Sequence, residues 1–269
     1  MPARAPKARG EAVPTRPSAA VRIAYQRALD KLIAEMHAST LYWLRATYRS
    51  NEAAIAMDAS PAADLAAQLA RRAAQWRKRF SDEAIPMARW IISKIDKHAT
   101  QSSRRAAVAL TGMSVSVKDT LVSKTVMQAS IQQNVSLIKS IQSEYATEVE
   151  GLVMRSVTAG RDLGALTDEL QQRYAITRRR AAFIATDQNN KATAQMARAR
   201  QLGMGITKAR WLHVGGGKQP RHSHVQANGK VFDLKRGLMI DGEYIFPGEL
   251  PNCGCVAAPI IPGVDDEDE

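Results

Sequence analysis

Residues that interrupt helices are distributed very unevenly along this chain, and this limits the folds it can adopt. The sequence up to residue 204 has few glycines or prolines inside its hydrophobic repeats. The stretch Trp211–Cys255 differs, because segments rich in Gly, Pro and Asn separate its other residues. Glycine and proline favour turns and end helices. The sequence therefore predicts a mainly α fold: a long helical body followed by a small, turn-rich α+β module with short strands at the C-terminus.

Hydrophobic residues recur at helical spacing in residues 21–50 and 119–159. In the first segment they are Tyr25, Leu29, Leu32, Ile33, Met36 and Leu44. In the second they are Val135, Ile138, Ile141, Tyr145 and Val149. We expect each segment to form one amphipathic helix that buries this face in the core. Trp43, Tyr42 and Tyr48 are interpreted as further core residues of the first helix.

Another helix is expected to begin with Ser60 as its N-cap and Pro61 as its first residue, a position that proline tolerates. Pro86 should kink or end this helix, since an interior proline removes a hydrogen bond. The helical pattern resumes over residues 87–110.

Thr167 and Thr177 both have the character of N-caps, so a short helix followed by a second helix ending at Gly203 is expected. This spacing also fits a helix-turn-helix, with Arg178 to Arg180 at the start of the second helix. An ordinary helical hairpin has the same spacing, and we favour it.

These features divide the chain into consecutive regions. We expect a disordered basic arm (1–20), a helical N-terminal region (21–118), a helical body (119–204), a C-terminal module (205–258) and an acidic tail (259–269). Short strands are predicted in the module at residues 209–214, 230–234 and 243–246.

The formal net charge of +12 indicates that the protein binds polyanions, because a basic surface attracts them. Non-specific double-stranded DNA is the expected partner, and improved solubility is the alternative. The candidate DNA-binding residues lie in the arm and on the helix after Pro61: Arg4, Arg9, Arg71, Arg72, Arg77, Lys78 and Arg79. No apolar run is long enough to cross a bilayer, so no membrane partner is expected.

The module holds both cysteines and three of the five histidines. His222, His224, Cys253 and Cys255 could supply four zinc ligands, since zinc binds imidazole and thiolate. In the alternative, which we favour, His224 and Arg221 hydrogen-bond across turns and the cysteines pack as small apolar groups. His224 as a base beside Arg221 would suit a small nuclease. We expect neither a cofactor nor catalysis.

Several motifs of the module occur together in a fixed order. They are Trp211, Arg221-x-x-His224, Gly229-x-x-Phe232, Pro247-Gly248 and Asn252-Cys253-Gly254-Cys255. This set resembles the C-terminal domain of phage Mu F-like head-morphogenesis proteins, which are related to the minor capsid protein family of phage SPP1. The resemblance covers about residues 119–256. It departs from the family at Gly254, where arginine is usual, at Ala185 to Gln188, where an Arg-Thr-Glu pattern is common, and at Lys218-Gln219, where an acidic residue often stands.

The resemblance implies a structural minor head protein of a tailed phage. It implies a role in head morphogenesis, with the portal protein, other capsid subunits and packaged DNA as partners. The phage head would be its location, with the host cytoplasm as the place of assembly. It also implies that Trp211, Arg221, His224, Gly229, Phe232, Pro247, Asn252, Cys253 and Cys255 form the framework of the module. A zinc-stabilised DNA-binding module and a nuclease-like or ADP-ribosyl-transfer enzyme are the alternatives.

Overall fold

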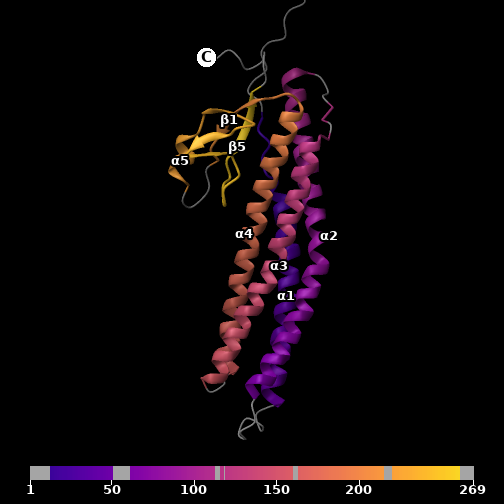
Figure 1. The fold of residues 1–269 in the computed structure, drawn as a ribbon, viewed down its shortest axis with the longest axis vertical. Coiled ribbons are helices and arrows are strands. Elements are labelled where there is room, and N and C mark those ends of the chain that lie inside the picture. Colours follow the sequence, from indigo (N-terminus) through magenta and orange to yellow (C-terminus); the bar gives the residue numbers. More distant parts are fainter. Residues whose placement is uncertain are drawn as a thin grey trace, which may run out of the picture. The chain divides into compact units, whose positions relative to one another are not determined.

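The structure, a computed structural model, describes residues 13–50, 61–112, 116–117, 119–159, 163–214 and 220–260. Long helices come first in the chain, and short elements follow them (Figure 1). The helices are α1 (Ala19–Ser50), α2 (Pro61–Thr111), α3 (Leu121–Thr158) and α4 (Leu163–Gly203). The short elements are β1 (Lys208–Leu212), α5 (His222–Gln226), β2 (Val231–Asp233), β3 (Leu238–Ile240), β4 (Glu243–Ile245) and β5 (Val256–Ile260). The predicted fold class, mainly α with a small α+β module, is confirmed.

The predicted pair of helices after residue 167 is wrong, because α4 is a single helix of 41 residues. Thr177 lies inside it, and its hydroxyl donates a hydrogen bond to the carbonyl oxygen of Arg173, 2.9 Å away. A threonine that bonds to the carbonyl four residues earlier fits a helix interior as well as a cap. No glycine or proline lies between Thr167 and Thr177 to interrupt the helix. The helix-turn-helix interpretation is therefore excluded.

α2 begins at Pro61 as predicted and continues through Pro86 for 51 residues. Pro86 therefore does not end the helix. Neighbouring residues compensate, since Phe80, Ala84 and Ala88 on either side of it are buried. Packing of this face outweighs the local cost of one interior proline.

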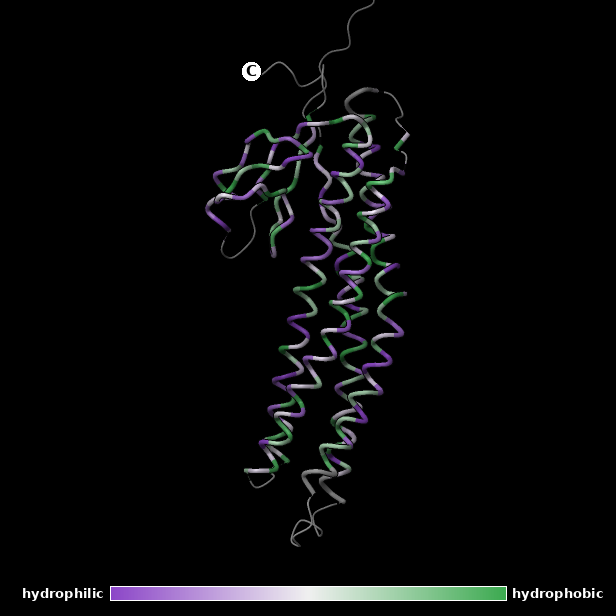
Figure 2. Tube along the Cα trace, viewed as in Figure 1, coloured by the Kyte–Doolittle hydropathy of each residue, from purple (hydrophilic) through white to green (hydrophobic). Residues whose placement is uncertain are grey.

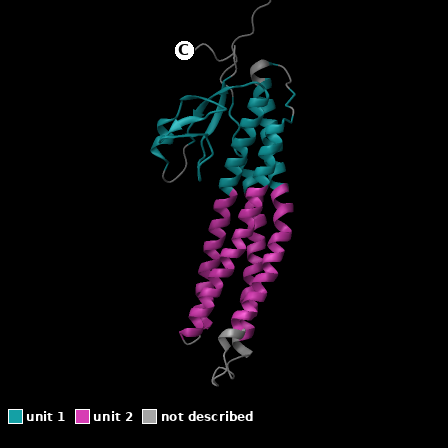
Figure 3. Cartoon of the chain, viewed as in Figure 1, with its two compact units in different colours: residues 1–22, 90–131, 186–269 teal, residues 23–89, 132–185 magenta. Residues whose placement is uncertain are grey.

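The chain forms two compact units, each built from segments that are far apart in the sequence (Figure 3). Unit 1 contains residues 1–22, 90–131 and 186–269, and unit 2 contains residues 23–89 and 132–185. The boundary passes through the long helices, so each of them contributes to both units. None of the described helices has a stretch apolar enough to span a membrane.

Unit 2 has a hydrophobic core lined by the residues that the periodicity identified. Tyr25, Leu29, Leu32, Ile33, Met36 and Leu44 are buried, as are Val135, Ile138, Ile141, Tyr145 and Val149. Figure 2 shows the corresponding interleaving of hydrophobic and hydrophilic residues along the helices. Trp43 is buried as expected, whereas the core position predicted for Tyr42 is wrong, since its side chain is 80% exposed. The side chain of Tyr48 lies outside the described part of the structure. Inside this core the His37 Nδ1 atom lies 2.8 Å from the Tyr145 hydroxyl.

Unit 1 joins the ends of helices to the C-terminal module. Arg200 on α4 is buried and lies 2.7 Å from Asp96 of α2 and 2.6 Å from Asp119. This group of charges connects three segments of the unit. A buried guanidinium needs such partners, because an unpaired charge in the interior is very costly.

The strands of the module form two small antiparallel sheets. One has the order β2-β1-β5 and the other consists of β3 and β4. In the first sheet Ala209 pairs with Phe232 on one side and with Pro259 on the other. The predicted strands correspond to β1, β2 and β4. The prediction missed β3, β5 and α5, which are short elements without a clear alternating pattern.

Candidate functional site

Trp211 forms the centre of the module's core. It lies on β1, the middle strand of the three-stranded sheet, and its side chain is fully buried. Its ring meets the His224 ring edge-on with centroids 5.2 Å apart, and the Phe232 ring with centroids 6.1 Å apart. Cys253 and Cys255 belong to the same cluster of buried residues. The large aromatic side chain therefore supports the residues that carry the module's chemistry.

Three groups with metal-ligand chemistry face one another beside this tryptophan. The Nδ1 atom of His224 lies 3.4 Å from the Cys253 sulfur and 3.8 Å from the Cys255 sulfur. The three ligand atoms lie within 4.8 Å of one another, and all three residues are buried. The Nδ1 atom of His213, at the end of β1, lies 3.5 Å from the Cys255 sulfur. We call His213, His224, Cys253 and Cys255 the His/Cys cluster.

The two cysteines are free thiols in different electrostatic surroundings. The Cys255 thiol and the backbone N–H groups of Cys255 and Gly248 hold the pKa of Cys253 below its usual value, against the opposing effect of burial. The Gly248 N–H group lies 3.3 Å from the Cys253 sulfur. The neighbouring Cys253 sulfur and burial raise the pKa of Cys255. Cys253 is therefore the more readily ionised of the two.

His222, proposed from the sequence as a cluster member, is exposed at the start of α5 and lies outside the cluster. His213 lies next to Cys255 instead, after a strand whose pairing fixes its position. The spacing His-x-His suggested that His222 and His224 act together, as they would on a strand. They lie on a short helix, where residues two apart do not face the same side.

The other framework residues place the loops around the cluster. The Arg221 guanidinium donates a hydrogen bond to the Pro251 carbonyl oxygen at 3.1 Å. Gly229 has a φ of +84° that favours glycine, and its N–H group donates to the Trp211 carbonyl oxygen at 2.8 Å. Pro247 is buried. The structure thus brings the predicted framework together in one unit.

The loop that carries the cysteines is held against α4 by residues that the sequence did not identify. The Asn252 N–H group donates to the Asp187 carboxylate at 3.0 Å. The Asn190 side-chain amide donates to the Cys253 carbonyl oxygen at 3.4 Å. Asp187 and Asn190 are polar residues on a helix that is buried on this side. Asp187 is buried and Asn190 is half-buried. Buried polar groups require partners, so the unbroken polar run from Asp187 to Lys191 within a helix is the signal that could have identified them.

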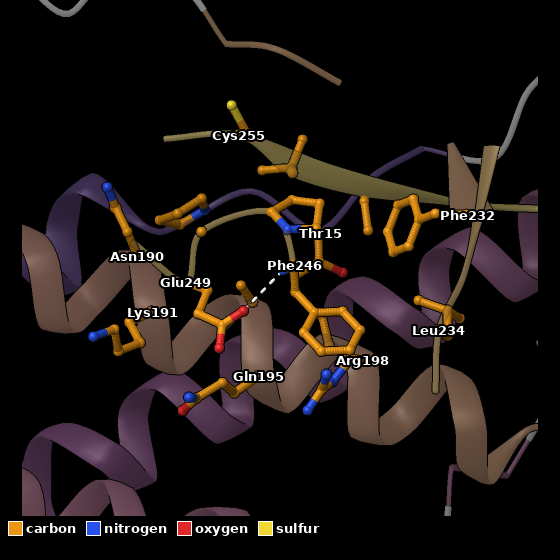
Figure 4. Close-up of a pocket in the computed structure, with 17 residues that line it drawn as sticks. Thr15, Asn190, Lys191, Gln195, Arg198, Phe232, Leu234, Phe246, Glu249 and Cys255 are labelled. Carbon is orange, nitrogen blue, oxygen red and sulfur yellow. Dashed lines mark hydrogen bonds between the residues drawn. The ribbon is translucent and has the colours of Figure 1, made fainter. Parts of the chain in front are cut away.

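A pocket lies next to this loop, between α4 and the strands of the module (Figure 4). The Arg198 guanidinium lies 3.7 Å from the centroid of the Phe246 ring. Burial lowers the pKa of Arg198, and the Glu249 carboxylate opposes this effect. That carboxylate accepts a hydrogen bond from the Phe246 N–H group at 2.8 Å. These contacts attach the Pro247 turn to the helix.

The candidate DNA-binding residues are only partly described. Arg4 and Arg9 lie outside the described residues. The basic residues of α2 named from the sequence, Arg71, Arg72, Arg77, Lys78 and Arg79, are all exposed. Lys78 forms an ion pair with Asp82 at 2.7 Å and Arg79 one with Glu35 at 2.6 Å. Much of the charge of these two residues is therefore already compensated.

Comparisons with known proteins agree with the motifs of the module. Residues 147–258 match the family model described as "Phage Mu protein F like protein". The match begins inside α3, later than the resemblance starting at residue 119 suggested, and it includes α4 and the module. A protein of Haemophilus influenzae described as "Uncharacterized protein" is 34% identical over 131 residues. That alignment covers 48% of this chain and 28% of the relative, so the chain spans well under half the length of the relative it matches. The search of solved structures found no match.

The family match therefore covers the His/Cys cluster, Trp211 and the helix that anchors them. This confirms the resemblance drawn from the ordered motifs. Residues 147–258 of this chain are similar to the phage Mu protein F-like family.

Proposed function

We propose that this protein is a minor head protein of a tailed phage, with a role in head morphogenesis and contacts with the portal protein or other capsid subunits. The observation that carries the proposal is the family match over residues 147–258, which includes α4 and the module as far as the middle of β5. The protein would then reside in the phage head after assembly in the host cytoplasm. Its action would be structural.

The exposed side chains of the helices support a docking role. Tyr42 on α1 is 80% exposed, and Leu121 and Val122 at the start of α3 are 82% and 55% exposed. Large apolar side chains in such positions contribute to protein contacts when they are covered by a partner. Tyr42 in unit 2, and separately Leu121 with Val122 in unit 1, each suit a contact with a neighbouring subunit.

The buried state of the cluster supports a structural role over a catalytic one. His224, Cys253 and Cys255 are each at most 4% exposed. A general base or nucleophile must lie within hydrogen-bond reach of its substrate. His224 instead directs its Nδ1 atom at two sulfur atoms of the protein. We therefore propose that the module does not act as a nuclease or a transferase.

Particle composition tests the proposal. Heads purified from a culture that produces the phage encoding this chain should contain the protein at a fixed ratio to the portal protein, as measured by quantitative mass spectrometry. A preparation of complete heads that lacks the protein, from cells that express it, would contradict the proposal.

Binding to DNA is the second part of the proposal. The ion pairs of the described arginines indicate which of them are available to contact phosphates. Arg71, Arg72 and Arg77 form no ion pair among the described residues. Arg72 lies over the Trp43 ring at 5.9 Å, so its guanidinium already has a contact within the protein. Arg71 and Arg77 are therefore the strongest candidates for phosphate contacts, which carry no sequence preference.

The double variant Arg71→Gln/Arg77→Gln is expected to weaken DNA binding and to reduce the slope of log K against log salt by about 1.8, since each phosphate contact contributes about 0.9. The matched variant Lys78→Gln/Arg79→Gln should reduce it less, because Asp82 and Glu35 already pair with these residues. Filter binding at several salt concentrations measures both slopes. Binding that does not depend on salt, or no binding at low salt, would remove DNA from the proposal.

A further inference from the structure

We propose that the C-terminal module binds one structural Zn²⁺ ion through the Nδ1 atoms of His213 and His224 and the sulfur atoms of Cys253 and Cys255. This site goes beyond the family assignment and the proposed head function. It also differs from the set suggested by the sequence, since His213 replaces His222.

The distances within the cluster fit a tetrahedral ion. Zinc binds sulfur at about 2.3 Å and imidazole nitrogen at about 2.0–2.1 Å, so ligand atoms in a tetrahedral site lie roughly 3.4–3.8 Å apart. The His224 Nδ1 atom lies 3.4 and 3.8 Å from the two sulfur atoms, and the His213 Nδ1 atom lies 3.5 Å from the Cys255 sulfur. An ion among His224, Cys253 and Cys255 would therefore require little movement of these three side chains, whose ligand atoms lie within 4.8 Å of one another. His213, which lies outside this group, would turn toward the ion to complete the site.

The chemistry of the four groups selects the metal. Thiolate and imidazole together favour zinc, whereas magnesium, calcium and manganese prefer oxygen ligands. Four protein ligands leave no position for a water molecule or a substrate, which is the pattern of structural sites. The low exposure of His224 and both cysteines fits this pattern.

Contacts outside the cluster hold the ligands in place before any ion binds. The Gly248 N–H group points at the Cys253 sulfur, at a distance of 3.3 Å. The backbone N–H group of His213 donates to the Asn228 side-chain oxygen at 2.9 Å. The His224 ring packs edge-on against Trp211, and its Nε2 atom is buried and has no hydrogen-bond partner among the described residues. Nδ1 is thus the nitrogen of His224 that faces the ligand atoms. Such supporting contacts orient ligands and strengthen metal binding.

The ion would connect parts of the module that are far apart in the sequence. His213 follows β1, His224 lies on α5, and the cysteines precede β5. Three of the five strands have only three residues each. A domain with so small a core gains much of its folding free energy from a bound metal. The ion would therefore act as a cross-link of the module.

Elemental analysis of the full-length protein, purified without chelator from zinc-supplemented cells, tests the site. We expect about one zinc per chain in the unaltered protein and less than about a tenth of that in Cys253→Ser, Cys255→Ser and His224→Ala, because structural sites need all four ligands. His213→Ala should lose zinc in the same way. His222→Ala is the matched control: His222 lies two residues from His224 but is exposed, and this variant should keep its zinc.

Two further measurements separate loss of the ion from loss of the fold. His213→Cys replaces one zinc ligand by another and should retain the metal, while circular dichroism should show unchanged helix content in every variant. Cobalt added to the metal-free protein should give the visible absorption of a tetrahedral thiolate site. The proposal would be overturned if the unaltered protein is purified without zinc and then binds neither added zinc nor added cobalt. Equal zinc content in His213→Ala and the unaltered protein would overturn the assignment of His213.

Discussion

Replacing Trp211 with alanine is expected to destabilise the C-terminal module by about 3–5 kcal/mol, the usual cost of removing a fully buried tryptophan. The side chain is 0% exposed and touches both the His224 and Phe232 rings. Its loss leaves a cavity in a core whose other buried members are all smaller side chains. The His224 ring also loses its packing partner, so the ligand atoms of the His/Cys cluster should no longer be held close together.

Hydrogen exchange followed by mass spectrometry measures this effect locally. Peptides that cover β1, β2 and β5 should lose protection in Trp211→Ala, while peptides of unit 2 should keep it. Met239→Ala, which removes a half-exposed side chain from β3 of the same module, is the control and should cost less than about 1 kcal/mol. Similar protection of the strands in both variants would show that Trp211 does not organise the module.

Replacing Arg200 with alanine is expected to destabilise unit 1 by about 3–5 kcal/mol, because it breaks a buried ion pair and leaves a carboxylate without its partner. The Arg200 side chain is 3% exposed and the Asp96 side chain 17% exposed, whereas Asp119 is 64% exposed. Most of the cost should therefore come from Asp96.

Urea denaturation of a double-mutant cycle separates these contributions. Asp96→Asn combined with Arg200→Ala should be less destabilising than the sum of the two single changes, since they share one interaction. Arg178→Ala provides the comparison: Arg178 pairs with Asp30 at 3.2 Å in unit 2, but its side chain is 49% exposed. Exposed pairs contribute about 0.2–1 kcal/mol. Equal effects of Arg178→Ala and Arg200→Ala would contradict the importance of burial at Arg200.

The long elements of this fold could be predicted because they rest on periodic patterns. The buried positions of α1 and α3, from Tyr25 to Leu44 and from Val135 to Val149, follow the helical period over several turns. A pattern of that length depends little on the rest of the protein. Pro61 likewise marks the start of α2 through its fixed backbone angle.

Other features depended on contacts that a local pattern does not contain. Thr177 has the side chain of a cap, but its hydroxyl bonds within the helix, and only the continued packing of α4 decides between these outcomes. β3 and β5 are short, and β5 is defined by pairing with β1, which lies more than forty residues earlier in the chain. Sequence spacing therefore could not identify them.

The sequence identified three members of the His/Cys cluster but not the fourth, for the same reason. The residue types pointed to His224, Cys253 and Cys255, which do meet. The partner of Cys255 is His213, and its proximity results from the pairing of β1 with β5. His222 was the nearer candidate in the sequence, but the helical conformation of α5 separates it from the cluster. Pairing between distant strands, not spacing, selects the fourth group.

The most direct test of the proposed role in head assembly is affinity capture of the tagged full-length protein from cells in which heads are being assembled, with the recovered proteins identified by mass spectrometry. The portal protein or other head subunits should be recovered well above the level seen with an untagged chain. Trp211→Ala should recover less of them, while Met239→Ala should behave like the unaltered protein. If the folded, unaltered protein recovers no head subunit while heads are being assembled, the account of this chain as a head-assembly protein is contradicted.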